Sequence, residues 1–192
     1  MYNLELLLLT TALLAVAAPL AVRLGREALF ALVALQALLA NLFVTKQIAL
    51  FHLELTASDP YAIGASIAIL TIQSRWGAKA AQSAIALSAF FLLFTTACML
   101  LHLALHPSTS DNMHAPAAQL FSHMPRVVLA SISAFACSQL LQVKLTNLFT
   151  PQSPSWGPYN ALLLAQVADA LLFFLLGLYG LVNAPIDVIA IS

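Results

Sequence analysis

The sequence predicts an all-α protein, a polytopic membrane helical bundle of about six transmembrane helices in one domain, residues 1–192. Charged residues make up 7% of the chain and hydrophobic residues 62%. A soluble domain carries about 25% charged residues, so lipid is expected to be the solvent for most of this surface. The apolar runs are each near the ~20 residues that cross a bilayer. No strand-length alternation is evident, and open sheets cannot satisfy their backbone in hydrocarbon.

The first two predicted spans lie in the N-terminal quarter of the chain. Residues 4–22 form an apolar run that carries Glu5 and lacks a basic N-terminal region, so we interpret it as a retained span rather than a cleaved signal. The polar stretch "RLGRE" (23–27) separates it from the second run, 28–50. The charges and proline of "HLELTASDP" (52–60) are expected to end the second span.

Four further runs complete the predicted bundle: residues 60–76, 80–105, 125–149 and 160–182. The run at 60–76 is the shortest. Polar stretches separate these spans: "SRWGAKA" (74–80), the long loop "HPSTSDNMHAP" (106–116), and "TPQSPSWGP" (150–158) with its three prolines. These stretches contain the glycines and prolines that end helices.

The distribution of basic residues predicts the orientation. With six spans, five basic residues fall on one side: Arg23, Arg26, Arg75, Lys79 and Lys144. The other side holds Lys46 and Arg126. Because cytoplasmic loops carry the excess of Lys and Arg, the first set is expected in the cytoplasm and both termini outside.

Polar residues inside the last two spans are the main indication of a site. In "LLLAQVADALLFF" (162–174), Gln166 and Asp169 are three residues apart and share one helical face. A carboxylate at mid-membrane costs about 2.5–3.5 kcal/mol, so such residues normally face the bundle interior. In "CSQLLQV" (137–143), Gln139 and Gln142 have the same spacing. Both pairs are expected near mid-membrane, around one cavity.

Carboxamides offer both hydrogen-bond donors and acceptors, which suits a planar, neutral ligand rich in heteroatoms, such as a nucleobase. Asn41 in "ANLFVTKQIALF" (40–51) and Gln73 at the end of the third run are further candidates. The predicted substrate-binding residues are therefore Asn41, Gln73, Gln139, Gln142, Gln166 and Asp169. Aromatic side chains such as Tyr159 or Trp156 are candidates to stack on the ligand. The alternative is that the amides only bond helix to helix.

Other functions lack support in the sequence. The net charge is zero and no basic run exists, so nucleic acid is not expected as a partner. The spacing of the histidines at 102, 106, 114 and 123 matches no common zinc pattern. No motif for a nucleophile, a zinc protease or a nucleotide phosphate is present. We therefore predict no enzyme, no cofactor and no metal.

The segments "ANLFVTKQIALF", "PRVVLASISAFACSQLLQV" and "AQVADALLFF" resemble the queuosine precursor transporter family, which was earlier described as vitamin uptake transporters. The resemblance covers nearly the whole chain. It implies a multi-pass protein of the bacterial inner membrane that imports 7-deazaguanine bases for tRNA modification. It also implies a bundle similar to the substrate-binding subunits of energy-coupling-factor transporters. The ligand contacts implied are Asn41, Gln73, Gln139, Gln166 and Asp169, with Lys46 and Arg126 as further candidates.

The chain departs from the pattern of this family at several positions. Gln142, Leu70 and Ser74 stand where the family usually has acidic or amide residues, and members usually continue past Ser192 with another helix. Two alternatives therefore stay open beside the importer: a non-transporting membrane subunit or scaffold, and a shortened inactive member. A homo-oligomer or an unidentified partner subunit also stays open.

Overall fold

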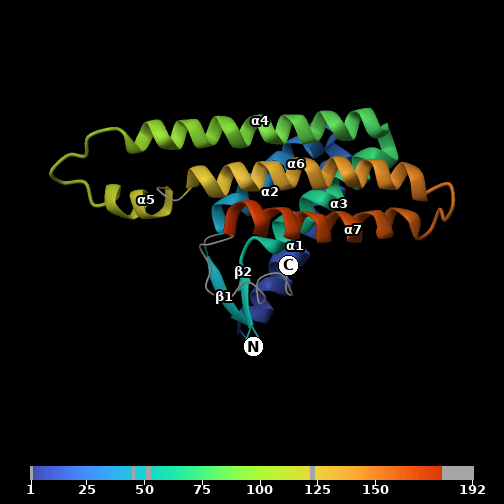
Figure 1. The fold of residues 1–192 in the computed structure, drawn as a ribbon, viewed down its shortest axis with the longest axis horizontal. Helices are drawn as coiled ribbons and strands as arrows, with labels where there is room; N and C mark the ends of the chain where they lie inside the picture. The colour runs from blue at the N-terminus through green and yellow to red at the C-terminus, as the bar shows by residue number, and fades with distance from the viewer. Residues whose placement is uncertain (1, 45, 51–52, 122–123, 179–192) are drawn as a thin grey trace.

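The computed structural model describes the chain except residues 1, 45, 51–52, 122–123 and 179–192, and it gives no side-chain environment for 53–55, 120, 124–127 and 178. The helices are α1 (Tyr2–Leu24), α2 (Arg26–Phe43), α3 (Asp59–Trp76), α4 (Ala78–Leu103), α5 (His114–Phe121), α6 (Met124–Phe149) and α7 (Gly157–Phe173), which continues as a π-helical turn, Phe174–Leu178. Two short strands, β1 (Gln47–Leu50) and β2 (Leu53–Thr56), lie between α2 and α3 (Figure 1). The predicted all-α membrane bundle is confirmed.

Five of the described helices are long and apolar enough to cross a membrane: α1, α2, α4, α6 and α7 with its π-helical turn. The chain is a multi-pass integral membrane protein. The third predicted span is a helix, α3, but it is not one of these five. Asp59, Gln73 and Arg75 make it more polar than the others. It packs against α1, α2, α4, α6 and α7, and because these helices shield it, it needs less lipid-compatible surface.

The direction of the chain reverses at two glycines in the left-handed region, Gly25 (φ 113°) between α1 and α2 and Gly77 (φ 83°) between α3 and α4. Such φ values are costly for residues with a Cβ atom. The turn between α6 and α7 lies at the same end of the bundle (Figure 1). This end carries Arg23 and Arg75 in the last turns of α1 and α3. The opposite end carries the β-hairpin and α5.

The predicted second span, 28–50, is wrong at its C-terminal end, because α2 ends at Phe43 and a β-hairpin follows. The strands pair antiparallel, with Gln47 opposite Thr56 and Leu50 opposite Leu53. The 18 residues of α2 already extend about 27 Å, close to the bilayer core. In β1, beyond the end of α2, exposed residues alternate with half-buried ones, which is the two-residue period of a strand. The Asn3 side chain donates to the Ala49 carbonyl at 2.9 Å, which ties the hairpin to the start of α1.

Two other boundaries differ from the sequence-based expectation. A short helix, α5, begins at His114, inside the stretch predicted as a long polar loop. The last predicted span, 160–182, corresponds to α7, which begins earlier, at Gly157. The π-helical turn continues this helix as far as Leu178. Residues 179–182 lie outside the described part of the chain. The spans predicted at 4–22, 80–105 and 125–149 correspond to α1, α4 and α6.

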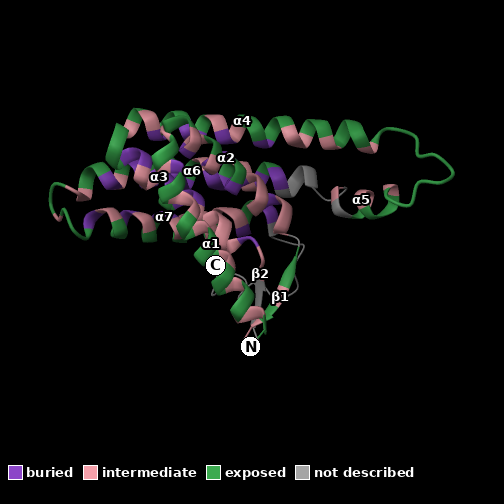
Figure 2. Cartoon of the chain, turned by 180° about the vertical axis from the view of Figure 1, so that it is seen from behind, coloured by how far each residue is buried: buried purple, intermediate pink, exposed green. Residues whose placement is uncertain are grey.

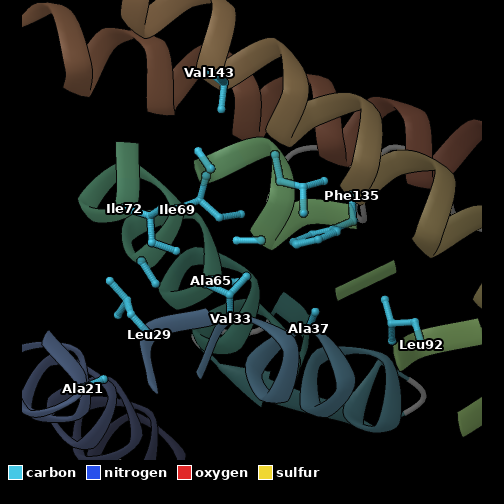
Figure 3. Close-up of a cluster of buried hydrophobic side chains, with 14 residues drawn as sticks. Ala21, Leu29, Val33, Ala37, Ala65, Ile69, Ile72, Leu92, Phe135 and Val143 are labelled. Atoms are coloured by element: carbon cyan, nitrogen blue, oxygen red, sulfur yellow. The ribbon is translucent and has the colours of Figure 1, made fainter. Parts of the chain in front are cut away.

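The core lies between α2, α3, α4 and α6 and is built largely from alanine and branched aliphatic residues. Leu29 and Val33 of α2 face Ala65 and Ile69 of α3, and none of the four is exposed (Figure 3). Small residues let helices approach closely, which matters in lipid because helix association there depends on packing. Figure 2 shows the buried residues concentrated along the inner faces, with exposed residues along α1 and α4. Many of those exposed residues are leucine or phenylalanine, as expected for a lipid-facing surface.

Candidate functional site

A single serine at the middle of α3 holds side chains from two other helices. Ser66 is fully buried. Its hydroxyl donates to the Ala62 carbonyl at 3.0 Å and accepts from Gln139 Nε2 at 2.9 Å and from Gln166 Nε2 at 2.6 Å. A hydroxyl has one proton to donate and two lone pairs to accept with. Because Ala62 takes the proton, both carboxamides act as donors, and the hydrogen-bonding capacity of the Ser66 hydroxyl is fully used.

A third carboxamide reaches the same residue through the backbone. Gln142 Nε2 donates to the Ser66 carbonyl at 3.0 Å. The predicted pairs of α6 and α7 therefore meet, and the residue between them belongs to α3. Ser66 was not predicted from the sequence. The segment "ASIAIL" contains a single serine, and no polar residue lies three or four positions away from it to mark a polar helix face. Serines in membrane helices commonly bond only to their own backbone.

Asp169 is held by the neighbouring residue on α6. The Ser138 hydroxyl, fully buried, donates to Asp169 Oδ1 at 2.7 Å. Ser138 and Gln139 are adjacent in sequence, so one turn of α6 contacts both Asp169 on α7 and Ser66 on α3. These bonds set the position of α7 relative to the helices beside it.

A small cavity of about 100 Å³ lies next to this network. Its polar lining comes from Asn41, Thr56, Ser58, Asp59, Ser131, Gln166 and Asp169. Its apolar lining includes the aromatic residues Phe135 and Phe173 and several alanines. Thr56, Ser58 and Asp59 belong to the hairpin end of the bundle, whereas Gln166 and Asp169 lie midway along α7. The cavity therefore extends from the hairpin towards the middle of the bundle.

The six predicted site residues fall into three places. Asn41, Gln166 and Asp169 line the cavity. Gln139 and Gln142 are buried behind it, where they bond to Ser66. Gln73 lies apart from both groups. It is seven residues beyond Ser66 on α3, or about 10 Å along the helix. Its Nε2 donates to the Val143 carbonyl at 2.9 Å and to Asn147 Oδ1 at 3.0 Å.

Several buried carboxamides leave their carbonyl oxygens without a partner. In the described part of the chain this holds for five residues, of which Asn41, Gln139 and Gln142 lie in or beside the site. The N–H groups of these three bond to the protein instead; Asn41 Nδ2, for example, donates to the Ala37 carbonyl at 3.0 Å. An unpaired buried acceptor costs about 1–3 kcal/mol. Asn41 is 6% exposed and lines the cavity, and its unpaired oxygen is buried beside it.

Asp59, at the first turn of α3, also lines the cavity and was missed as a candidate. It lies outside the five spanning helices, and in the sequence it is one of the charges that end the second predicted span. Thr56 Oγ1 donates to Asp59 Oδ1 at 2.5 Å, and Ser58 Oγ lies 3.5 Å from the same oxygen. Burial raises the pKa of the Asp59 carboxyl, and the two hydroxyl contacts act in the opposite direction.

The remaining candidates lie away from this cavity. Trp156 and Tyr159 are 69% and 57% exposed at the opposite end of α7, where their rings contact each other edge-on. Phe135 and Phe173 are the aromatic residues beside the cavity instead. Lys46 is exposed just before β1. The side chain of Arg126 lies outside the described part of the structure.

Two comparisons with known proteins relate this chain to transporters. Residues 62–191 match the family described as "Putative vitamin uptake transporter". A "Probable queuosine precursor transporter" from Bacillus subtilis (strain 168) is 28% identical over 169 residues, which cover 84% of this chain and 73% of the relative. No solved structure matches. The family match includes Ser66, Gln166 and Asp169, whereas Asn41 and Asp59 precede it.

Proposed function

Because this chain belongs to the vitamin uptake transporter family, we propose that it imports a queuosine precursor, a 7-deazaguanine base destined for tRNA modification. The observation that carries the proposal is the convergence of Asn41, Gln166 and Asp169 on one cavity. The similarity to a queuosine precursor transporter of Bacillus subtilis supports the choice of substrate.

The hydrogen-bonding groups of the cavity favour a ligand that donates several protons. Asp169 and Asn41 both line the cavity, and the Asn41 carbonyl oxygen is buried without a partner among the described residues. Gln166 uses its Nε2 on Ser66, so its Oε1 is left to accept. A guanine-like edge carries a ring N–H next to an exocyclic amine, and it matches such a row of acceptors. An analogue without these donors would leave buried acceptors unpaired and lose affinity.

The apolar part of the lining suits the faces of the base. Phe135 and Phe173 line the cavity together with alanines. Stacking of a base on an aromatic ring contributes about 1–3 kcal/mol.

The cavity, at about 100 Å³, is smaller than the ~300–1,000 Å³ of typical ligand pockets. Binding therefore requires it to widen, and the hairpin end, which contributes Thr56 and Ser58, belongs to the part of the lining outside the five spanning helices.

Uptake by living cells tests the proposal. The chain is expressed in bacteria that cannot make queuosine and lack an importer of their own, and 7-deazaguanine bases are supplied in the medium. We expect queuosine to appear in tRNA, measured by mass spectrometry of nucleosides. Ser83→Ala, a change at an exposed serine on α4, serves as an active control. Absence of queuosine with every base supplied, while the protein is present in the membrane, contradicts the proposal.

A second candidate, a non-transporting membrane subunit, is favoured by one observation. The N–H groups of Gln139, Gln142 and Gln166 all bond to Ser66, and such bonds hold helices together without any ligand. In that case the polar network is structural, and a change confined to the cavity lining has no effect on uptake or on precursor binding.

A further inference from the structure

A groove with a volume of about 860 Å³ lies between α1 and α3. From α1 it is lined by Leu7, Thr11, Leu14, Ala15, Ala18, Pro19, Val22 and Arg23, and from α3 by Pro60, Ile63, Gly64, Ile67, Thr71 and Arg75, with Asp59 and Thr56 at the hairpin end. Most of this lining is apolar. The surface of the groove is therefore compatible with hydrocarbon chains.

The groove exists because α1 packs loosely on the rest of the bundle. Ala21 is the one residue of α1 that is buried among those described. The lining residues recur at helical spacing on both helices, so each helix contributes a continuous stripe. From Leu7 to Val22 the stripe on α1 covers sixteen residues, or fifteen helical rises and about 22 Å. One leaflet of the bilayer core is about 15 Å thick, so the groove is long enough for an acyl chain.

Charge is distributed unequally along the groove. Arg23 and Arg75 lie at the ends of α1 and α3 that share one end of the bundle, and Asp59 lies at the other end. Within the described residues, the recorded ion pair joins Arg26 and Glu27 at 3.3 Å, and none involves Arg23 or Arg75. The predicted orientation places these two arginines on the cytoplasmic side, where anionic lipids are concentrated.

We propose that this groove binds an anionic phospholipid of the inner leaflet, with an acyl chain between α1 and α3 and the phosphate between Arg23 and Arg75. Guanidinium groups bind phosphate oxygens in pairs of hydrogen bonds. An anionic lipid is favoured over a zwitterionic one, because among the described residues no acidic side chain lines this end of the groove to meet a choline or ethanolamine head group. The bound lipid would fill the space that the packing of α1 leaves open.

The site is separate from the proposed transport cavity. The two hollows share Thr56, Asp59 and Ile63 at the hairpin end, far from the two arginines. Asn41, Gln166 and Asp169 line the cavity and not the groove. Lipid binding at the basic end can therefore be tested whether or not the chain transports a base.

The test measures lipid retention by native mass spectrometry of the full chain after exchange into phosphatidylglycerol or phosphatidylcholine. We expect the wild type to retain phosphatidylglycerol preferentially. The double variant Arg23→Gln/Arg75→Gln should bind it roughly 30-fold more weakly, from about 1 kcal/mol per basic residue. The matched control Lys79→Gln/Lys144→Gln removes the same charge from the same end but outside the groove, and it should keep the preference.

A groove-filling change gives a second, charge-neutral test. Ala15→Phe lies in the lining on α1, and it should reduce retention of both lipids while Arg23 and Arg75 stay in place. Three results would overturn the proposal: equal retention of the two lipids by the wild type, an equal loss in the lysine control, or unchanged retention in Ala15→Phe. A dimer that forms in lipid-free wild type and disappears in Ala15→Phe would also overturn it, because the occupant would be a second copy.

Discussion

The side chain of Gln36 on α2 occupies the space that a Cβ atom would need at Gly64 on α3. A Cβ atom at residue 64 would lie 2.9 Å from Gln36 Nε2 and 3.2 Å from its Cδ. Gln36 is 1% exposed, and its Oε1 has no partner within the described chain. The absence of a side chain at Gly64 therefore allows a buried carboxamide to fit between the two helices.

Gly64→Ala is expected to destabilise the protein by about 1 kcal/mol, because overpacking outweighs the better helix propensity of alanine. In a Gln36→Ala background the same change should become neutral or stabilising, since the obstacle is gone. Thermal unfolding in detergent of the four members of this double-mutant cycle measures the coupling. An equal loss of stability in both backgrounds would show that Gly64 matters for another reason.

Ser66→Ala should destabilise the protein by about 2–3 kcal/mol, because it leaves the Nε2 groups of Gln139 and Gln166 without their acceptor. Ser88→Ala is the matched control. Ser88 is also fully buried and donates to the carbonyl of Ala84 at 2.8 Å, but no side-chain donor to it is recorded among the described residues. Its loss should cost less than about 1 kcal/mol. Similar shifts in unfolding temperature for the two variants would contradict the role given to Ser66.

The sequence predicts the spanning helices well because lipid imposes a minimum apolar length on each of them. The weakest prediction, residues 60–76, corresponds to α3, whose partial shielding by other helices frees it from that requirement. The hairpin at 47–56 was missed for a related reason. Its alternating leucine and isoleucine residues continue the apolar run of α2, and hydrophobicity alone does not separate a helix from a strand.

The candidate site was predictable only in part. The three-residue spacing in α6 and α7 places Gln139, Gln142 and Gln166 on faces that do converge. What they converge on, Ser66, is a single small residue on a third helix and leaves no periodic signal. Asp59 resembles an ordinary charge in a turn, and its position beside the cavity depends on how the hairpin folds back onto the bundle.

Asp59→Asn should make stability less dependent on pH. Burial raises the pKa of Asp59 above its ordinary value of 3.8, so the folded state favours the protonated form. The stability gained from that form is complete below pH 3.8 and is lost as the pH rises through the folded pKa. The asparagine variant should therefore unfold at a higher temperature than the wild type at neutral pH, with the difference vanishing in acid. Glu5→Gln, at an exposed position, should show no such difference; a constant offset at all pH values for Asp59→Asn would contradict the explanation.

Asp169→Asn separates a binding site from a purely structural network. An asparagine oxygen can still accept the proton of Ser138, which donates to Asp169 at 2.7 Å, so the packing of α6 on α7 and the unfolding temperature should change little. The variant loses the negative charge and gains an N–H group that faces the donors of a guanine-like edge. Uptake should therefore fall by about tenfold or more, in line with roughly 1.5–3 kcal/mol for a hydrogen bond to a charged group. Ser138→Ala is the complementary control, because it leaves the carboxylate in place and removes only its support; it should lower uptake less. Full uptake by Asp169→Asn in the queuosine assay would remove this carboxylate from substrate recognition and favour the structural alternative.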